Sequence, residues 1–557
     1  MEQNKMSYRH IQKIFIANRG EIALRIITTA RKMGIRTVMP VTPEEQNSLP
    51  AIEADELHIL QNNSPEGSYL NEDLMIRMAL DHGADAIHPG YGFLSEKATF
   101  GAKTEKAGLI WIGPPPAAIA GMGNKLKARE TAQKAGLAMS RAMEGTTEDI
   151  LANKDQLAFP LLIKAAAGGG GKAMQIARNE EELKKLLSVA TAEAQRYFGD
   201  NTVFVEEYIE SPRHIEVQIL GDHYGNVVHL FERECSIQRR YQKIIEEAPS
   251  PFVDEALRER LTKDAIRLAK EMGYFNAGTV EFLVDAKGQH YFLEMNTRIQ
   301  VEHPVTEAIT GIDMVEQQIK VAMGLPLGFS QDELAMNGHA IEARIYAEDA
   351  LKEFTPSPGT IHFVKWPDKR AVRTDTFFTG KTEILPGFDP MLAKIIAHGP
   401  TREVARKNLS GSLEATTVLG ITTNLPYLTR LIKTQAFVNG DTTTHFSGIH
   451  QEMLYQSILP NGPEKTNLLM AAYAVWLTRY RVEQSNTVWT RLGHYRWNNN
   501  FKAKVNDDDF TIRILRHSSA GNLSWSLNHK EMPDIENMRF SEHDITFTFN
   551  QKVRQFN

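Results

Sequence analysis

The sequence predicts a mixed fold class, α/β together with α+β, spread over three to four domains. Its 557 residues are more than one domain of ~150 residues would use. Near the start, short apolar runs alternate with a helical pattern, which is typical of parallel β-α-β units. Beyond residue 463 the pattern changes to short β-rich runs, which indicates a separate domain.

Composition excludes several classes of protein. Hydrophobic residues make up 42% and charged residues 24% of the chain, so it is neither disordered nor collagen-like. The net charge of −6 argues against broad nucleic-acid binding. No run of ~20 apolar residues predicts a membrane span. The single Cys235 excludes an internal disulfide and fits a reducing compartment, so we expect a cytoplasmic protein.

The first domain is expected to be a parallel α/β sheet. Residues 13–17 and 35–41 are strand-like, and the stretch between them predicts a helix that ends before Gly34. Residues 84–88 and 109–112 predict further buried strands, and a Gly-Pro-Pro-Pro run then marks a boundary. No G-x-G-x-x-G follows the first strand, so a dinucleotide site is not indicated.

The rest of the chain divides at proline- and glycine-rich breaks. A second unit of mixed helices and strands reaches from about 123 to 325, and a third begins near 338. Residues 459–463 predict a linker, and 466–481 predict a helix. The β-rich runs that follow lie at 510–515, 523–527 and 545–549.

Paired carboxylates in the second unit predict a divalent-cation site. A turn centred on Lys287 and Gly288 would set Glu281 opposite Glu294 in a hairpin. Facing carboxylates repel unless they share a cation, and Asn296 could complete the set of oxygen ligands. Such ligands favour Mg²⁺ or Mn²⁺ over zinc, and magnesium held by few side chains usually also binds nucleotide phosphates.

Polar side chains fall on every second position from Glu294 to Glu302. In an extended chain they would all project to one face. A solvent-exposed strand face is the alternative, but the core-like runs nearby weaken it. We therefore expect a charged edge over residues 294–302.

A run of four glycines predicts a phosphate lid. Gly168 to Gly171 follow a strand-like run that ends at Lys164. Consecutive backbone N–H groups in such a run can form an anion-binding concavity. The spacing is not that of a P-loop, and a merely flexible loop is the alternative.

Two further motifs hold cationic residues. Residues 233–243 include three arginines and a lysine, and Cys235 among them has no recognisable partner histidine, so it is a poor candidate nucleophile. In the second motif, alternation sets Glu342, Arg344 and Tyr346 on one face. That arginine belongs either to a site or to a buried salt bridge.

These motifs together resemble the biotin carboxylases, a branch of the ATP-grasp enzymes. The matching strings are I-A-N-R-G-E-I-A at 16–23, H-P-G-Y-G-F-L-S-E at 88–96, M-G-N-K at 122–125, I-K-A-A-A-G-G-G-G-K at 163–172, P-R-H-I-E-V-Q at 212–218, Q-R-R-Y-Q-K at 238–243 and E-M-N-T-R-I-Q-V-E-H-P-V-T-E at 294–307. The resemblance covers residues 10–447. The region after 463 is more weakly similar to the inter-subunit domain of acyl-CoA carboxylase α subunits.

The resemblance implies four domains and one reaction. The domains are a Rossmann-like pre-ATP-grasp domain at 10–122, an ATP-grasp domain at 123–325, a C-terminal biotin carboxylase domain at 338–447 and an inter-subunit domain, a helix plus a β-rich part, at 464–557. The reaction is carboxylation of biotin by ATP and bicarbonate through carboxyphosphate. It needs positioning and cations more than covalent catalysis.

The resemblance also assigns roles to residues. Two ions, Mg²⁺ or Mn²⁺, would be held by Glu281, Glu294 and Asn296. Bicarbonate would be held by Lys243, Arg298 and the backbone of Val301, with Glu302 as its base. Arg344 would stabilise negative charge on the biotin oxygen. ATP would be surrounded by Lys125, Lys164, Gly168, Gly169, Gly170, Gly171, Glu206, Ile209, His214, Gln238, Tyr241, Glu281 and Glu294.

Three positions depart from the family pattern. Ala173 stands where the glycine lid usually continues with glycine, which bears on lid mobility and on a positive φ there. Tyr241 stands where histidine is frequent, and Phe388 replaces a frequent tyrosine. None of the three removes a residue assigned to chemistry.

The resemblance also implies partners. The α subunits usually end in a biotinyl domain with an A/V-M-K-M string, which is absent here. We therefore expect either biotin borne by another chain or a fragment that ends before that domain. The implied partners are a biotin carrier protein or domain, a carboxyltransferase β subunit and further copies of the chain, with no nucleic acid and no membrane. Methylcrotonyl-CoA is favoured within the methylcrotonyl-, propionyl- and acetyl-CoA carboxylase group.

Other functions stay open on the sequence. An ATP-grasp ligase with another acceptor would turn over with ammonia or an amine, but the strings around Lys243 and Arg344 argue against it. A pyruvate-type carboxylase subunit would use the same first step. A non-enzymatic assembly subunit would bind no nucleotide, and the complete metal and ATP sets disfavour it.

Overall fold

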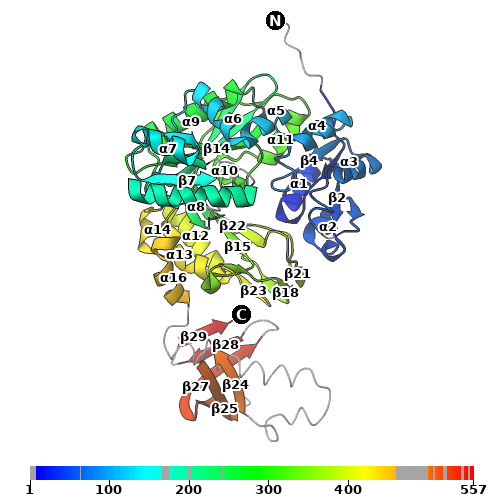
Figure 1. Cartoon of the computed structure of the whole chain (residues 1–557). Coiled ribbons are helices and arrows are strands. Elements are labelled where there is room, and N and C mark those ends of the chain that lie inside the picture. The colour runs from blue at the N-terminus through cyan, green and yellow to red at the C-terminus, as the bar shows by residue number, and fades with distance from the viewer. Residues whose placement is uncertain are drawn as a thin grey trace. The chain divides into compact units, whose positions relative to one another are not determined.

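The computed structural model describes residues 8–62, 64–165, 175–198, 203–240, 242–458, 500–505, 508–517, 523–540, 545–549 and 552–556. The chain forms two compact units, Met1–Gln451 and Glu452–Asn557 (Figure 1). All the predicted site residues belong to the first unit. Among the described residues, no helix is both long and apolar enough to cross a membrane.

A parallel sheet opens the first unit, as the sequence predicts, but it has five strands, and β3 was not among the predicted ones. Its order is β3-β2-β1-β4-β5. The strands are β1 (Lys13–Ile16), β2 (Arg36–Val41), β3 (Glu56–Ile59), β4 (Ala86–His88) and β5 (Ile110–Trp111), connected through α1 (Gly20–Lys32), α2 (Leu49–Glu53), α3 (Glu72–Asp81) and α4 (Ala98–Lys106). The order reverses between β1 and β4, so the loops after these strands meet at the carboxyl edge, where open α/β sheets bind ligands.

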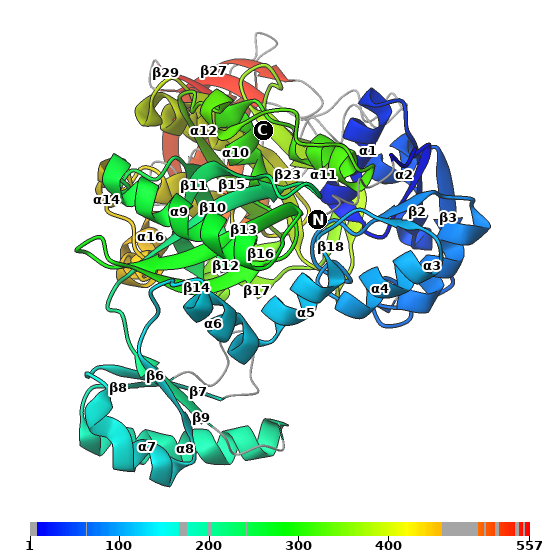
Figure 2. The ribbon, with the colours of Figure 1, turned by 90° about the horizontal axis from the view of Figure 1, so that it is seen from above.

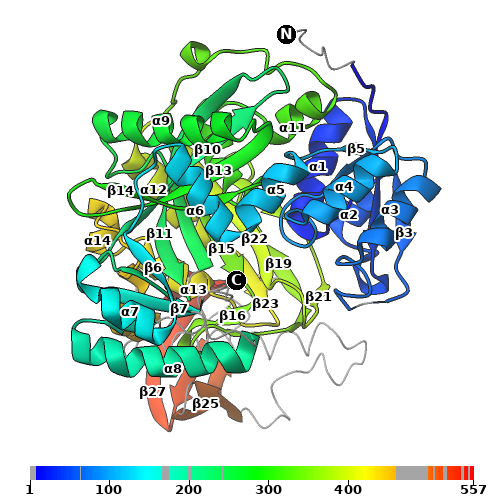
Figure 3. The same ribbon diagram turned by 45° about the horizontal axis from the view of Figure 1, so that its top comes forward.

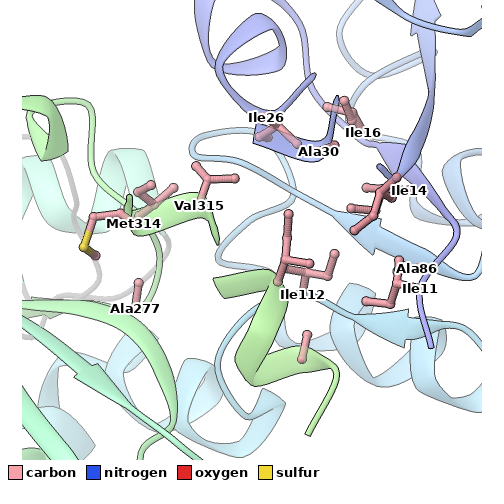
Figure 4. Close-up of a cluster of buried hydrophobic side chains, with 14 of the residues drawn as sticks. Ile11, Ile14, Ile16, Ile26, Ala30, Ala86, Ile112, Ala277, Met314 and Val315 are labelled. Atoms are coloured by element: carbon pink, nitrogen blue, oxygen red, sulfur yellow. The ribbon is translucent and has the colours of Figure 1, made fainter. Parts of the chain in front are cut away.

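Alternate residues of β1 pack on opposite faces of this sheet. Ile14 and Ile16 belong to a core that also contains Ile26 of α1 and Val315 of α11 (Met314–Ala322) (Figure 4). Phe15 belongs to the core on the other face. The first of these cores joins the N-terminal sheet to the helical segment that follows the predicted site.

The largest sheet of the first unit has eight antiparallel strands in the order β14-β13-β10-β11-β12-β15-β22-β20. Its strands are β10 (Arg213–Gly221), β11 (Val227–Arg239), β12 (Gln242–Ala248), β13 (Asn276–Val284), β14 (His290–Asn296), β15 (His339–Tyr346), β20 (Arg373–Thr376) and β22 (Met391–Gly399). Because β12 pairs with β15, the sheet continues across the predicted boundary between 325 and 338. Helix α9 (Glu255–Glu271) packs on β10 and β11, and α12 (Arg402–Ala415) packs on β15 and β22 (Figure 3).

A separate four-stranded sheet contains the strands that precede and follow the predicted lid in the sequence. Its order is β6-β9-β7-β8, from β6 (Ala142–Gly145), β7 (Leu161–Ala165), β8 (Gln175–Ala177) and β9 (Val203–Glu207). Helices α7 (Thr147–Asn153) and α8 (Glu180–Phe198) cover one face of it (Figure 2). Leu183 and Leu187 of α8 are fully buried in the core beneath. The glycine run and Ala173 fall between β7 and β8, outside the described residues.

The predicted extended run over 294–302 is wrong beyond Asn296. Strand β14 ends there, and an irregular segment leads to α10 (His303–Thr310). Glu302 is the N-cap of α10, and Pro304 fits the first turn, where no N–H partner is needed. Among the described residues, the remaining α-helices are α5 (Pro116–Gly123), α6 (Lys125–Lys134), α13 (Leu425–Leu431), α14 (Gln435–Asn439), α15 (Phe446–Ile449) and α16 (Gln451–Ile458).

The second unit contains a six-stranded antiparallel meander in which each strand pairs with the next. Its strands are β24 (Asn500–Val505), β25 (Asp508–His517), β26 (Leu523–Leu527), β27 (Lys530–Phe540), β28 (Ile545–Phe549) and β29 (Lys552–Phe556). The three predicted strands near 510–515, 523–527 and 545–549 are confirmed. The predicted linker at 459–463 and helix at 466–481 lie outside the described residues. Trp525, Ile535 and Phe547 are buried in this unit.

Candidate active site

A β-bulge sets the two predicted metal carboxylates opposite each other. Near the turn of the β13–β14 hairpin, Phe282 pairs with Phe292, one residue out of the predicted register. The register then shifts, and Leu293 is the extra residue of β14. Glu281 therefore faces Glu294, as predicted, although the turn alone would not place it there.

Glu281 is buried among four polar side chains. Its Oε1 accepts from Lys243 at 2.9 Å and from Asn296 and Gln300 at 2.7 Å each, while His214 Nε2 lies 2.7 Å from Oε2. Burial by itself raises the pKa of Glu281, but the charges of Lys243 and His214 outweigh it and hold that pKa well below its usual range. The carboxyl of Glu281 is thus held in the ionised state that cation binding requires.

Glu294 is the more exposed partner of the pair. Loss of water around its carboxyl and the negative charge of Glu281 raise the pKa of Glu294. A divalent cation held by both residues would relieve this repulsion. With the amide oxygen of Asn296, the donors are all oxygens, which fits Mg²⁺ or Mn²⁺.

Lys243 joins three carboxylates. Its Nζ lies 2.6 Å from Glu216, 2.9 Å from Glu281 and 2.7 Å from Glu302. Burial alone would lower the pKa of Lys243, but the three negative charges raise it well above its usual range. The ammonium therefore stays charged at neutral pH and is suited to bind an anion.

Glu302 connects Lys243 to Arg344. Its Oε1 accepts from Lys243 at 2.7 Å, and its Oε2 accepts from Arg344 Nη2 at 2.9 Å. Burial raises the pKa of Glu302, but the charges of Lys243 and Arg344 hold it well below its usual range. The N-terminus of α10 also favours the anion. A carboxylate held between two cations becomes a better base when a substrate draws one of them away.

Arg298 and Val301 adjoin this cluster. Arg298 donates to Glu96 at 3.0 Å and to Asn296 at 2.8 Å, and Asn296 in turn reaches Glu281. The carbonyl of Val301, next to Glu302, accepts from Lys394 of β22 at 2.8 Å. The structure thus brings the three residues predicted to hold bicarbonate close to the predicted base.

Family profiles match almost the whole first unit. "Biotin carboxylase, N-terminal domain" matches residues 10–119, "Carbamoyl-phosphate synthase L chain, ATP binding domain" 124–329 and "Biotin carboxylase C-terminal domain" 342–448. The chain is 48% identical to Biotin carboxylase 2 of Bacillus subtilis (strain 168) over 441 residues, 79% of this chain and 99% of that protein. The chain belongs to the biotin carboxylase family.

Relatives with longer chains and solved structures agree. The α subunit of methylcrotonoyl-CoA carboxylase of Dictyostelium discoideum is 41% identical over 99% of this chain and 81% of its own length. The biotin carboxylase domain dimer of Hydrogenobacter thermophilus 2-oxoglutarate carboxylase, solved with MgADP, ADP and bicarbonate, matches with a TM-score of 0.76 and 42% identity over 80% of this chain and 99% of that one. As a biotin carboxylase, the chain is an ATP-dependent ligase that carboxylates biotin.

The residues that a biotin carboxylase is expected to use for ATP come from several segments. Gln238 lies 2.9 Å from His214, which contacts Glu281, so these three form one group. Lys164 and Glu206 lie on the paired strands β7 and β9. Lys125 begins α6, and Ile209 lies between β9 and β10. Four glycines and one tyrosine of the set lie outside the described residues, namely Gly168, Gly169, Gly170, Gly171 and Tyr241.

Sequence reasoning missed Arg233 and its partner Glu216. Arg233 is fully buried. Its guanidinium donates to five side chains, those of Glu216, Gln218, Thr279, Gln300 and Thr306. Glu216 in turn accepts from Lys243. A signal was present, because His214, Glu216 and Gln218 alternate along one strand and so share a face.

Phe388 stands where biotin carboxylases frequently have tyrosine, and its contacts do not require the tyrosine hydroxyl. Its ring contacts Tyr69 and Phe93, with centroids 6.1 and 6.5 Å away. The guanidinium of Arg19 lies 4.3 Å from the ring centroid. Both contacts need an aromatic ring and no hydroxyl.

Proposed function

We propose that this biotin carboxylase serves an acyl-CoA carboxylase, with methylcrotonyl-CoA as the favoured acyl substrate. The support is the alignment with the methylcrotonoyl-CoA carboxylase α subunit, which covers 99% of the chain and therefore includes the second unit. Pyruvate carboxylase of Aspergillus terreus matches over only 78% of the chain. The propionyl-CoA carboxylase α chain of Ruegeria pomeroyi, 40% identical over 92% of the chain, represents the competing assignment.

The observation that carries the catalytic proposal is the contact of Glu302 with both Lys243 and Arg344. Lys243, Arg298 and the backbone of Val301 hold bicarbonate, and Glu302 removes its proton. The freed oxygen attacks the γ-phosphorus of ATP, the bond from that phosphorus to ADP breaks, and carboxyphosphate forms. Positioned cations stabilise the charge that develops in this transfer.

The nucleotide site follows the same proposal. Glu281, Glu294 and Asn296 hold Mg²⁺ or Mn²⁺, which neutralises charge on the transferring phosphoryl group when bound. ATP is surrounded by Lys125, Lys164, Gly168 to Gly171, Glu206, Ile209, His214, Gln238 and Tyr241. The contact of Gln238 with His214 fixes these two side chains before the nucleotide arrives.

Arg344 acts on biotin in this proposal. Carboxyphosphate gives up its carboxyl group to a ureido nitrogen of biotin, and the phosphate that leaves accepts the proton of that nitrogen. Negative charge meanwhile develops on the ureido oxygen, and the guanidinium stabilises it. Glu246 and Glu302 hold that guanidinium in a buried position. Such preorganisation makes the interaction stronger than it would be in water.

Partners follow from the reaction. A carrier protein or domain presents biotin, and a carboxyltransferase β subunit receives the carboxyl group. The solved biotin carboxylase domain dimer supports a homo-oligomer for this chain. The cytoplasm is the compartment that we propose.

Release of ADP tests the reaction. With Mg-ATP and bicarbonate we expect turnover that rises on addition of free biotin. Turnover that follows ammonia or an amine and ignores biotin would support a ligase with another acceptor.

A second assay tests the acyl substrate. The holoenzyme reconstituted with a biotin carrier and a β subunit is offered methylcrotonyl-CoA and propionyl-CoA as matched substrates. Faster carboxylation of methylcrotonyl-CoA supports the assignment, and faster carboxylation of propionyl-CoA contradicts it.

A further inference from the structure

Two buried glutamates stand directly opposite each other beside Arg344. Glu246 of β12 and Glu342 of β15 are cross-strand partners in the antiparallel pairing of these strands. Directly opposed side chains start roughly 5 Å apart at Cβ and share one face of the sheet. Both residues are 0% exposed, so no bulk water screens them from each other.

The two carboxyls differ in their partners. Arg344 Nε lies 2.6 Å from Glu246 Oε1, and Arg344 Nη2 lies 2.9 Å from Glu302. Among the described residues, no cation lies within ion-pair distance of Glu342, and neither carboxyl of the two glutamates accepts a hydrogen bond. Lys394, the cross-strand neighbour of Arg344, directs its ammonium to Val301 and Glu21 instead.

A fully ionised pair does not suit this environment. Like charges directly opposite in a sheet destabilise it, and a buried carboxylate without a donor costs several kcal/mol. A proton on Glu342 removes the second charge and supplies the donor that this part of the sheet lacks. Glu246 then remains the carboxylate that faces Arg344.

We propose that Glu246 and Glu342 share one proton, held chiefly on Glu342, and that this pair positions Arg344 for biotin. The proposal rests on the function assigned to Arg344 above. It makes Glu246 and Glu342 positioning residues, since they act on biotin only through the guanidinium.

The charged surroundings agree with one shared proton. Burial raises the pKa of Glu246 to about 7 despite the charge of Arg344. Burial also raises the pKa of Glu342 well above its usual range despite the charge of Lys394. The charged groups that act on the pair come from four elements, namely Lys243 on β12, Glu302 at the start of α10, Arg344 on β15 and Lys394 on β22.

The net charge of the Glu246–Glu342 pair determines how strongly Arg344 is attracted to the pair relative to Glu302. With one proton, the pair and Glu302 each offer the guanidinium one negative charge, so it is held from both sides. If the pair lost its proton, two charges would draw the guanidinium from biotin. If the pair gained a second proton, Arg344 would bind Glu302 more tightly. Glu302 would then be a weaker base, because the ion pair stabilises its ionised form.

Infrared spectroscopy of the full chain tests the shared proton directly. We expect the C=O stretch of a buried protonated carboxyl at neutral pH, lost in Glu342→Gln. Glu232→Gln is the matched control, because Glu232 is equally buried but accepts two hydrogen bonds of 2.8 Å from Arg258. A band that persists in Glu342→Gln, or that disappears in Glu232→Gln, would overturn the proposal.

Steady-state kinetics tests the positioning role. Glu246→Gln is expected to lower kcat/KM for free biotin by about tenfold or more, the usual loss of a charged hydrogen-bond partner, and to leave the KM for ATP within about twofold. Glu342→Gln is expected to remove an alkaline fall in kcat/KM for biotin. An equal rise of both KM values in Glu246→Gln, or an unchanged alkaline fall in Glu342→Gln, would contradict the role.

The same assays separate this proposal from the proposed function. If wild-type protein shows no biotin-dependent turnover but the carboxyl band behaves as expected, the function fails and the shared proton stands. If turnover depends on biotin but the band is absent, the shared proton fails alone.

Discussion

Glu302 is the residue on which the proposed chemistry most depends. Its ion pairs with Lys243 and Arg344 keep it ionised, and an ionised carboxylate is what a base for bicarbonate must be. Glu302→Gln keeps the size of the side chain but cannot accept a proton. We expect kcat for bicarbonate-dependent ADP release to fall by about 10²- to 10⁴-fold. Calorimetric affinity for Mg-ATP should change little, and a variant that retains near-normal turnover would refute the role.

Arg344 links catalysis to stability. Arg344→Ala removes the cation between two buried carboxylates, Glu246 and Glu302. We expect biotin-dependent turnover to be lost and the free energy of unfolding to fall by about 3–5 kcal/mol, the usual cost of an uncompensated buried charge. Urea denaturation measures the second effect. An unchanged unfolding midpoint would contradict the buried ion pairs.

The contacts of a residue could be predicted where its partners lie close to it in the sequence, and not where they lie far away. Glu281 and Glu294 lie on one hairpin, so their pairing could be predicted, although the predicted register holds only beyond the bulge. The bulge at Leu293 was not visible in the sequence. It shifts the register by one residue, which offsets the one-residue difference between the predicted and the observed turn. Arg233 was not predicted as a hub, because its partners come from segments as much as 73 residues apart.

At the scale of elements, Arg233 holds strands β10, β11 and β13 to the loop before α10. All its partners are side chains of those segments or of α10 itself. Arg233→Met leaves Glu216 buried without this cation, so we expect a loss of about 3–5 kcal/mol in the free energy of unfolding. The matched control is Arg240→Met, whose exposed pair with Glu353 should contribute at most about 1 kcal/mol. Equal effects of the two variants on urea denaturation would contradict this account.

The regular elements were mostly predictable, and the polar run was not. Strands with continuous apolar residues, such as 13–17, and the helix before Gly34 follow from local pattern. The alternation from 294 to 302 looks like a strand throughout, but Glu302 caps α10 and the backbone leaves the sheet after Asn296. The alternating side chains Asn296 and Gln300 reach the same carboxylate without one regular strand.

For the whole molecule, the buried glutamate pair predicts how stability depends on pH. The pKa of Glu342 is raised in the folded state, so the native protein binds this proton more tightly than the unfolded chain does. Stability from this group is therefore present at low pH and is lost as pH rises from about 4.5 through the higher folded pKa. Glu342→Gln should remove that loss.

Urea unfolding of wild type and Glu342→Gln at about pH 5 and about pH 8 measures this effect. Relative to that of wild type, the free energy of unfolding of Glu342→Gln should be higher at the higher pH than at the lower one. Glu232→Gln serves as the control, because Glu232 is equally buried but is paired with Arg258. A difference between wild type and Glu342→Gln that is independent of pH would contradict the raised pKa.

The order of the domains could be predicted, but their joining could not. Sequence breaks separate 123–325 from the segment that begins near 338, yet β12 and β15 pair across that break within one sheet. Such pairing joins strands about a hundred residues apart, and no local pattern encodes it. The site depends on it, because Lys243 lies on β12 and Arg344 on β15.

The most direct test of the central claim is transfer of label from isotopically labelled bicarbonate to free biotin in the presence of Mg-ATP. The account predicts labelled carboxybiotin from the wild-type chain, in an amount that follows ADP release, and none above background from Glu302→Gln. ADP release without labelled biotin, or equal labelling by wild type and Glu302→Gln, would contradict it.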